Sequence, residues 1–316
     1  MRFSIIIPTY NYGKFIKKAV ESILLQKGGF SYEILIIDDA STDNTKEIVK
    51  QLLKENENIK YFVNKKNEGT AFCYRKGILA SKGEIICILD ADDLWKSNKL
   101  VEINNFFEKK EDVSLLFHNA DKIDSKGNLI SSNIFNKPSN ECIYSPIEVL
   151  KKDFFGPLGS TLCFNSNFIK KIKIPKEVYA AVDGYLLLAT ILRRGKVYYL
   201  DKSLSFYRFH QNSTTYSANI KKLISNLNNY SIMLSKCYNL CRKNKDFSYI
   251  YFLSKLSYLR AKILEGKKVN KIYFEKLLIT LFDIIGLKKF VFYTLLNLNK
   301  DFYLFLRKYF YRYFYK

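Results

Sequence analysis

The sequence has little glycine and proline, few acidic residues and no long uncharged apolar stretch. Its 316 residues include 13 glycines and 5 prolines, whereas 48% of the residues are apolar. Collagen-like and low-complexity chains need far more glycine and proline, and disordered chains are much poorer in large apolar side chains. Both classes are therefore excluded. The length suffices for one large domain, or a domain with an appendage, that buries a sizeable core.

Several familiar motifs are also missing. The six cysteines form no CxxC pair, and Cys87 and Cys163 lie inside apolar runs, so we expect reduced core thiols in a cytoplasmic protein. Neither GxGxxG nor GxxxxGK[ST] occurs, so a bound phosphate must be held by something other than a glycine-rich loop. No stretch of about 18 uncharged apolar residues is present, so we expect no membrane-spanning helix.

The net charge of +22 is concentrated in one part of the chain. Residues 1–220 carry 32 basic and 25 acidic residues, whereas residues 221–316 carry 20 and 5. This shift predicts a mixed α/β domain over residues 1–217 and a basic, aromatic-rich helical region over residues 218–316.

The end of the basic region has an unusual composition. Residues 302–316 contain nine aromatic and four basic side chains and no acid. This mixture favours the headgroup region of an anionic membrane, so we expect peripheral attachment at the inner face of the cell membrane. The alternative is that the aromatic side chains pack as a helical lid on the first domain or in a dimer seam.

Short β-branched runs alternate with helix-like stretches over the first ninety residues. The strand-like runs are Ser4–Ile7, Ile34–Ile37, Ile59–Val63 and Ile85–Leu89. The helix-like stretches are Lys14–Gln26, Thr42–Lys54, for which Ser41 and Thr42 are the expected caps, and Thr70–Ser81. This alternation predicts an α/β fold with a mostly parallel central sheet that helices cover on both faces. Such sheets bind ligands at the carboxyl ends of their strands.

Acidic residues gather at two of these strand ends. Asp38 and Asp39 follow the second strand, and three carboxylates follow the fourth strand in Asp90–Asp93. Unpaired carboxylates at one edge of a sheet repel one another and raise each other's pKa, which suits a site that receives a cation. Mg²⁺ or Mn²⁺ prefers carboxylate oxygens together with the phosphate oxygens of its ligand. The pattern therefore predicts a divalent metal on Asp90 and Asp92.

These motifs together resemble family 2 of the glycosyltransferases, which are inverting, use nucleotide-sugar donors and have the GT-A fold. The resemblance covers residues 3–215 and rests on the runs SIIIPTYN, IIDDASTDNT, NEGTA and ILDADD. It implies transfer of a hexose or N-acetylhexosamine from a nucleotide sugar, with a UDP-sugar expected. The expected acceptor is a hydroxyl of a glycan or lipid-linked molecule in surface polysaccharide or glycoconjugate assembly, and no nucleic acid is expected as a partner.

The resemblance assigns the nucleotide donor to residues at three strand ends. In the family the tyrosine of the first loop packs on the nucleobase, a carboxylate after the second strand bonds the base, and one after the fourth strand reaches the ribose and the metal. The matching residues are Pro8, Thr9, Tyr10, Asp39 and Asp90. An arginine of the third helix usually contacts the nucleotide. Here that helix reads Cys73-Tyr74-Arg75, so the contact is displaced to Arg75 or lost.

The resemblance also implies a metal site and a general base. Asp92 and Asp90 would hold Mn²⁺ or Mg²⁺, and His210 would lie on the metal or the diphosphate. Asp183 would take the acceptor proton, although the glutamate that often precedes this residue in the family is absent. Capping of the next helix would also explain Asp183, and the two roles are compatible. Trp95, beside the acidic loop, either stacks on a sugar or packs under the next helix.

Two other functions would also account for parts of the sequence. A nucleotidyltransferase shares the metal and nucleotide chemistry, but such enzymes usually open with a glycine-rich basic loop, where this chain has PTYNYG. A nucleic-acid-binding protein would explain the charge of +22. The basic excess, however, lies away from the ordered motifs, and no zinc finger, RNP or KH signature is present. We therefore expect a metal-dependent glycosyltransferase.

Overall fold

The computed structural model describes residues 1–135, 158–179, 181–210 and 220–240. The chain divides into two compact units, Met1–Tyr216 and Ser217–Lys316. The described part of the second unit is helix α8 (Ile220–Leu240). The aromatic-rich residues 302–316, and with them the expected membrane-binding helices, lie outside the described residues. No described helix combines the length and apolar character needed to cross a membrane.

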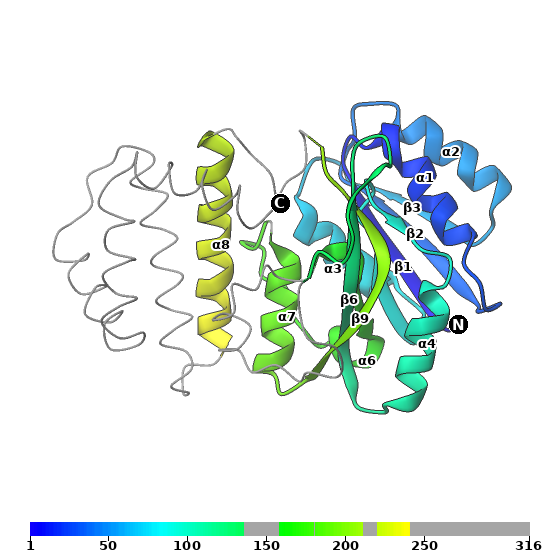
Figure 1. Cartoon of the computed structure of the whole chain (residues 1–316). Coiled ribbons are helices and arrows are strands. Elements are labelled where there is room, and N and C mark those ends of the chain that lie inside the picture. The colour runs from blue at the N-terminus through cyan, green and yellow to red at the C-terminus, as the bar shows by residue number, and fades with distance from the viewer. Residues whose placement is uncertain (136–157, 180, 211–219, 241–316) are drawn as a thin grey trace. The chain divides into compact units, whose positions relative to one another are not determined.

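The first unit is built on one mixed sheet (Figure 1). Its described strands are β1 (Phe3–Thr9), β2 (Tyr32–Asp38), β3 (Ile59–Val63), β4 (Ile85–Ile88), β5 (Leu94–Trp95), β6 (Val113–Ile123), β7 (Leu129–Ser131), β8 (Leu162–Asn165) and β9 (Lys196–Arg208). They run in the order β3-β2-β1-β4-β8-β6-β9-β5, with β7 paired to β6. Strands β1 to β4 form a parallel block, as the alternation predicts, and β8 joins this block to β6 through two antiparallel pairings.

Helices cover both faces of this sheet. In addition to the 3₁₀ turn η1 (Gly159–Thr161), they are α1 (Gly13–Leu24), α2 (Thr45–Glu55), α3 (Thr70–Ala80), α4 (Lys99–Lys109), α6 (Ser166–Ile169) and α7 (Val182–Leu192). In Figure 1, α1, α2 and α4 lie on one side of the sheet, and α3, α6 and α7 lie on the other. Strands β1, β2 and β4 are therefore buried on both faces, which is why they are nearly continuous apolar runs, whereas the edge strand β3 is only partly buried.

The caps predicted for α2 at Ser41 and Thr42 are wrong, because α2 begins later, at Thr45. The Asp43 carboxylate accepts the backbone N–H of Thr45 at 3.0 Å and that of Gly13 at 3.0 Å. One side chain thus holds the beginnings of α1 and α2 together. The loop between β2 and α2 lies beside the loop between β1 and α1, to which it is hydrogen-bonded through Asn11.

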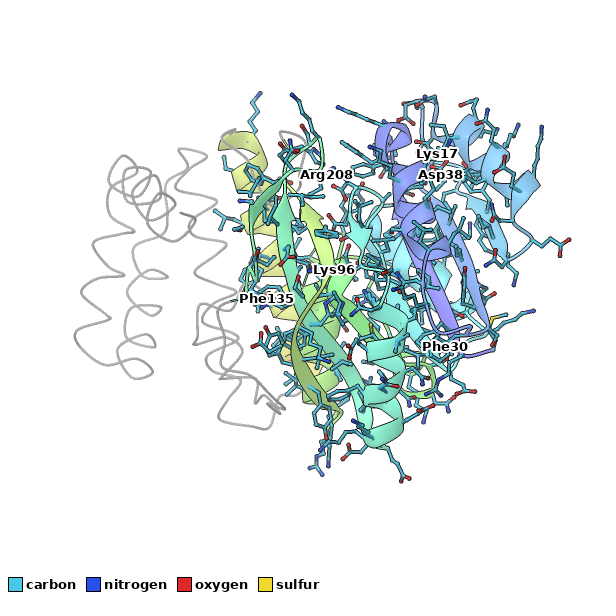
Figure 2. All side chains as sticks on the ribbon, turned by 45° about the vertical axis from the view of Figure 1, so that its right-hand side comes forward. Lys17, Phe30, Asp38, Lys96, Phe135 and Arg208 are labelled. Carbon is cyan, nitrogen blue, oxygen red and sulfur yellow. The ribbon has the colours of Figure 1, made fainter. Side chains whose placement is uncertain are left out.

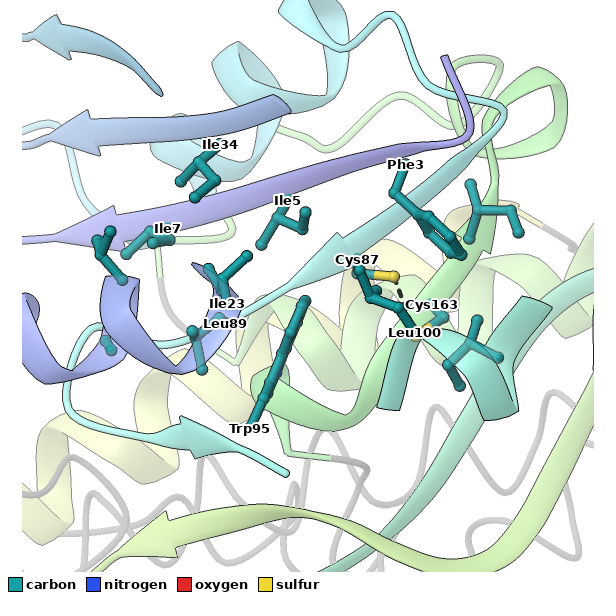
Figure 3. Close-up of a cluster of buried hydrophobic side chains, with 14 of the residues drawn as sticks. Phe3, Ile5, Ile7, Ile23, Ile34, Cys87, Leu89, Trp95, Leu100 and Cys163 are labelled. Atoms are coloured by element: carbon teal, nitrogen blue, oxygen red, sulfur yellow. Dashed lines mark hydrogen bonds between the residues drawn. The ribbon is translucent and has the colours of Figure 1, made fainter. Parts of the chain in front are cut away.

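The core of the first unit lies where α1 and α4 pack on the sheet (Figure 3). Cys87 of β4 and Cys163 of β8 are paired across these two strands, and their sulfur atoms are 3.3 Å apart. Both are buried free thiols, which confirms the prediction of core cysteines. The fully buried apolar side chains around them include Phe3, Ile5, Ile7, Ile23, Ile34 and Leu89.

Trp95 belongs to the same core and is 3% exposed. The ammonium group of Lys99, on the first turn of α4, lies 3.8 Å from the centroid of the Trp95 ring. Of the two alternatives for this side chain, packing under the next helix is therefore correct.

The parallel register brings the ends of β1, β2 and β4 to one edge of the sheet. Thr9 pairs with Asp38 at the ends of β1 and β2, and Ile6 pairs with Ile88 at the end of β4. Figure 2 shows Asp38 at the same end of the unit as Arg208, which ends β9. The candidate site residues predicted to follow these strands therefore lie at one edge of the sheet.

Near the start of β2, the buried carboxylate of Glu33 connects β1, β3 and the segment before β4. It accepts hydrogen bonds from the Ser4 hydroxyl at 2.7 Å, the Lys82 N–H at 2.7 Å and the Lys60 ammonium at 2.6 Å. Burial raises the pKa of Glu33, but these hydrogen bonds outweigh burial and hold the pKa below its usual value.

We predict that Glu33→Gln lowers the free energy of unfolding by about 1–3 kcal/mol at pH 7, because buried donors lose a charged acceptor. A folded-state pKa below the unfolded value of about 4.3 stabilises the protein above that pH, and the contribution is lost as the pH falls through the folded pKa. Urea unfolding at pH 7 and at pH 3 should therefore show a smaller difference between wild type and variant at pH 3.

Glu102→Gln is the matched control, because Glu102 forms an ion pair of 2.7 Å with Lys202, whose side chain is 52% exposed. Exposed pairs contribute about 0–1 kcal/mol. Equal losses for the two variants at pH 7 would contradict the role of Glu33.

Candidate active site

Strand β1 leads directly into the loop that the sequence assigns to the donor. Pro8 and Thr9 are the last two residues of β1, where they pair with Ile37 and Asp38 of β2 and are buried. The Oγ1 atom of Thr9 has no hydrogen-bond partner among the described residues. Tyr10 follows with 43% of its surface exposed, so its ring reaches solvent at the edge of the sheet.

The carboxylate of Asp39 is 3% exposed and is oriented by the loop between β3 and α3. Its Oδ1 accepts the side-chain amide of Asn64 at 2.8 Å and the N–H of Glu68 at 2.9 Å, and its Oδ2 accepts the N–H of Gly69 at 2.7 Å. The N–H of Asp39 donates to the carbonyl of Thr9 at 2.9 Å. Asp39 is thus fixed beside the loop that carries Tyr10.

The neighbouring Asp38 supports the fold instead. Its Oδ1 accepts the Ser41 N–H at 2.8 Å, and its Oδ2 accepts the Tyr61 hydroxyl. Burial, then the hydrogen bond to Asp38 and the negative charge of Asp38, raise the pKa of Tyr61. Of the two adjacent carboxylates, Asp39 is the one that contacts the β3–α3 loop and the end of β1, beside the loop that the sequence assigns to the donor.

The acidic loop after β4 is attached to η1 through Ser160. The Ser160 hydroxyl accepts the N–H of Asp90 at 2.9 Å and donates to Oδ2 of Asp93 at 2.6 Å. The other oxygen of Asp93 accepts the N–H of Arg208 at 2.8 Å. Asp93 is buried and holds the loop in place, whereas Asp90 and Asp92 are partly exposed at the strand end.

The carboxylates of this loop repel one another, as their spacing predicts. Burial, followed by the charges of Asp92 and Asp183, raises the pKa of Asp90 to about 8, and hydrogen bonds from Ser160 and from the Tyr74 hydroxyl oppose this shift. Burial, followed by the charges of Asp92 and Asp90, also raises the pKa of the buried carboxyl of Asp93. A cation beside Asp90 and Asp92 would relieve this repulsion.

His210 meets the acidic loop from a distant part of the chain. Its Nε2 atom lies 3.0 Å from Oδ2 of Asp92, and its ring stacks on Phe15 with the ring centroids 5.1 Å apart. Arg208 donates from Nε to the carbonyl of Asp92 at 2.7 Å. The structure thus brings together Asp92 and His210, two of the three residues that the sequence proposes for the metal.

Asp183 lies in the first turn of α7, after Ala181, which adopts a left-handed backbone conformation with φ of 56° at the N-cap position. Asp183 is therefore not the cap residue. Its Oδ1 accepts the N–H of Gly184 at 2.8 Å, and burial raises its pKa. The charge of Asp183 acts on Asp90 and Tyr74, so the three side chains are close enough to interact electrostatically.

Arg75 is held by contacts away from the acidic loop. Its Nη1 donates to the carbonyl of Ile174 at 3.1 Å, and its guanidinium lies 5.4 Å from the centroid of the Phe72 ring. The residue before it, Tyr74, is fully buried against Asp90. The contact of Arg75 with a nucleotide stays a prediction.

Sequence reasoning assigned no role to two residues that shape the site, Tyr74 and Lys99. Lys99 is fully buried, its Nζ donates to the Ser160 carbonyl at 2.8 Å, and burial lowers its pKa to about 8. A Cβ atom on Gly159 would lie 2.5 Å from both Oδ2 of Asp90 and the Tyr74 hydroxyl. The GPLGST run is the one signal that could have indicated this close approach, because glycine permits it.

The carboxylate and imidazole groups at this site suit a divalent ion that is also coordinated by a diphosphate. Among the residues that the structure describes, no three or more His, Cys, Asp or Glu side chains form a metal-binding group. The described site offers Asp92 with His210, and Asp90 at the end of the same strand. Because Mg²⁺ and Mn²⁺ often bind through one or two carboxylates plus substrate phosphates, this set suits such an ion and does not form a closed cage.

Solved structures that resemble this chain include glycosyltransferases of the GT-A fold. TarS of S. aureus, in complex with UDP-GlcNAc, has a TM-score of 0.58 and 17% identity, over 90% of this chain and 89% of TarS. The mannosyltransferase PcManGT of Pyrobaculum calidifontis, in complex with GDP-Man and Mn²⁺, has a TM-score of 0.54 and 16% identity, over 94% and 84%. These similarities confirm the predicted GT-A fold.

Sequence comparison then defines the family. The model of glycosyl transferase family 2 matches residues 4–169. An uncharacterized glycosyltransferase of Nostoc sp. is 30% identical over 66% of this chain and 65% of its own length, and one of Rickettsia felis is 30% identical over 85% of this chain and 42% of its own length. The chain belongs to glycosyl transferase family 2, as its motifs predict, and it spans less than two thirds of the length of these relatives.

Proposed function

We propose that the chain transfers a hexosyl or N-acetylhexosaminyl group, with inversion, from a nucleotide sugar to a hydroxyl of a glycan or lipid-linked acceptor in surface polysaccharide or glycoconjugate assembly. The observation that carries this proposal is the gathering of Asp39, Asp90, Asp92 with His210, and Asp183 around one edge of the sheet. Family membership favours this function over nucleotidyl transfer and nucleic-acid binding. A UDP-sugar is the proposed donor, in keeping with the TarS complex.

In this proposal, residues of three strand ends hold the donor. Asp39 accepts a hydrogen bond from the base, the exposed ring of Tyr10 packs on the base, and Asp90 reaches the ribose. Asp92 and His210 hold the diphosphate end through Mn²⁺ or Mg²⁺, and the Mn²⁺ complex of PcManGT supports this choice of ion. Such an ion would act as a Lewis acid that neutralises the charge of the departing diphosphate.

Asp183 serves the acceptor side of the proposed reaction. A direct displacement needs a base that removes the acceptor proton, and no covalent enzyme intermediate is required. Burial raises the pKa of Asp183, which makes its carboxylate a stronger base, and the N–H of Gly184 orients one of its oxygens. The ionised carboxylate takes the proton as the acceptor oxygen attacks the sugar carbon.

We predict that UDP binding depends on a divalent ion and that Asp92→Asn abolishes this dependence. Calorimetry should show wild-type affinity at least about tenfold higher with Mn²⁺ than without it, a difference of about 1.4 kcal/mol. The variant should bind with the same low affinity in both conditions, because it lacks the charged ligand. Asp112→Asn is the matched control, since Asp112 precedes β6 and pairs with Lys196 on the surface. A wild type that binds equally well with and without Mn²⁺ would refute the metal role.

We further predict that Asp183→Asn leaves UDP affinity within about twofold of wild type. The rate at which UDP is released from its nucleotide sugar should fall by about 10²–10⁴-fold, which is the typical contribution of a general base. A coupled assay of nucleotide release measures this rate, again with Asp112→Asn as the control. If the variant keeps more than about a tenth of the wild-type rate, another carboxylate is the base.

We also propose that the protein binds peripherally to the cytoplasmic face of the membrane through its aromatic and basic C-terminal residues. This proposal rests on the sequence, because residues 302–316 combine nine aromatic and four basic side chains without an acid. Each basic side chain near an anionic surface contributes about 1 kcal/mol, and high salt screens this attraction.

Replacing Arg307, Lys308 and Arg312 by glutamine in the full chain should therefore reduce cosedimentation with phosphatidylserine vesicles by about a hundredfold at low salt. The matched control replaces the exposed Lys46, Lys50 and Lys54 of α2 by glutamine, which removes the same charge elsewhere. Equal binding by the two triple variants would exclude the C-terminal residues as the anchor and favour their packing as a lid or dimer seam.

A further inference from the structure

A second exposed aromatic side chain, Tyr179, stands beside Asp39. It precedes α7, and 49% of its surface is exposed, compared with 43% for Tyr10. Isolated exposed aromatic side chains are common, so exposure alone assigns no role to Tyr179. Its position relative to the base-binding carboxylate is the informative feature.

Gly69 connects Tyr179 to Asp39 directly. The N–H of Gly69 donates to Oδ2 of Asp39 at 2.7 Å, and a Cβ atom on Gly69 would lie 2.4 Å from two carbons of the Tyr179 ring. The ring therefore rests on the α-carbon of the residue that orients the carboxylate. Apart from burial, the charges of Asp39 and Tyr10 are the main causes that raise the pKa of Tyr179, in agreement with this placement.

The Tyr179 ring is held in position before any ligand arrives. Its hydroxyl donates to Oδ1 of Asn67 at 2.5 Å, and its carbonyl accepts the N–H of Ala71 at 3.4 Å. The preceding residue, Val178, is 1% exposed and anchors the backbone. A half-exposed ring with fixed neighbours is a preorganised surface for stacking, because little side-chain entropy remains to be lost on binding.

The segment that carries Tyr179 is tied to the helices on its own side of the sheet. Arg75 of α3 donates to the Ile174 carbonyl at 3.1 Å, and the hydroxyl of Tyr185 on α7 donates to the Lys173 carbonyl at 2.9 Å. The arginine that family resemblance assigns to the nucleotide thus supports the segment that ends in Tyr179.

We propose that Tyr179 forms a second aromatic contact for the nucleobase of the donor, in addition to Tyr10, next to the Asp39 carboxylate. This inference rests on the proposed function, because it requires that Asp39 binds the base. Stacking of a base on an aromatic side chain is lost when the ring is removed, and such losses correspond to a decrease in affinity of about fivefold to about a hundredfold. Every base has a π-face, so both pyrimidine and purine nucleotides would be affected.

Calorimetry with Mn²⁺ tests the proposal on the full chain and three probes: UDP, GDP and inorganic pyrophosphate. Tyr179→Leu should weaken the binding of each nucleotide that wild type binds by about fivefold or more, and it should leave pyrophosphate binding unchanged because pyrophosphate has no base. Tyr179→Phe keeps the ring and loses only the hydroxyl contact with Asn67, so its nucleotide affinity should stay within about threefold of wild type.

Other outcomes separate the possible failures. Wild-type nucleotide affinity in Tyr179→Leu would overturn the proposal, and so would an equal loss for pyrophosphate, since that indicates general damage to the site. If wild type binds neither nucleotide, the proposed function itself fails. A loss of nucleotide binding in Tyr179→Phe as large as in Tyr179→Leu would also overturn the proposal. Such a loss would mean that the hydroxyl contact with Asn67, and not the ring, is required for binding.

Discussion

Carboxylate crowding at the end of β4 is the constraint on which the site depends. Burial and like charges raise the pKa values of both Asp90 and Asp93. Ser160 offsets part of this cost, because its hydroxyl bonds to both residues and its carbonyl accepts the buried ammonium of Lys99. Each buried polar group left unpaired would cost about 1–3 kcal/mol, so this network holds the loop in one conformation. The remaining repulsion between Asp90 and Asp92 is what favours a cation there.

The parallel strands and the carboxylates that follow them could be predicted because the sequence signals for both lie within short segments of the chain. Strands β1, β2 and β4 are buried on both faces, so each is a short, mainly apolar run that can be recognised without knowledge of its partners. The edge strand β3 is only partly buried, but it still has the β-branched and aromatic residues typical of a strand. The residues that follow such a strand must lie at the carboxyl edge of the sheet. Tyr10, Asp39 and Asp90 could therefore be placed on one edge from the order of the chain alone.

The other parts of the site depend on contacts between distant residues. Asp93 bonds to the N–H of Arg208, 115 residues away, and Lys99 bonds to Ser160, 61 residues away. Lys99 begins an amphipathic helix, where a lysine is ordinarily solvated, so nothing in the local pattern indicates its complete burial. Strand β5 has only two residues, too few for any periodicity. Such features can be identified only from the three-dimensional structure.

Asp39 combines a fixed carboxylate with one unused acceptor position. An ionised carboxylate offers about four acceptor positions, and Asn64, Glu68 and Gly69 occupy three of them. A donor N–H of a nucleobase can add to the remaining position without displacing the loop that orients the carboxylate. The hydrogen bonds from the β3–α3 loop therefore preorganise Asp39 for the base contact proposed above, and little reorganisation would oppose that contact.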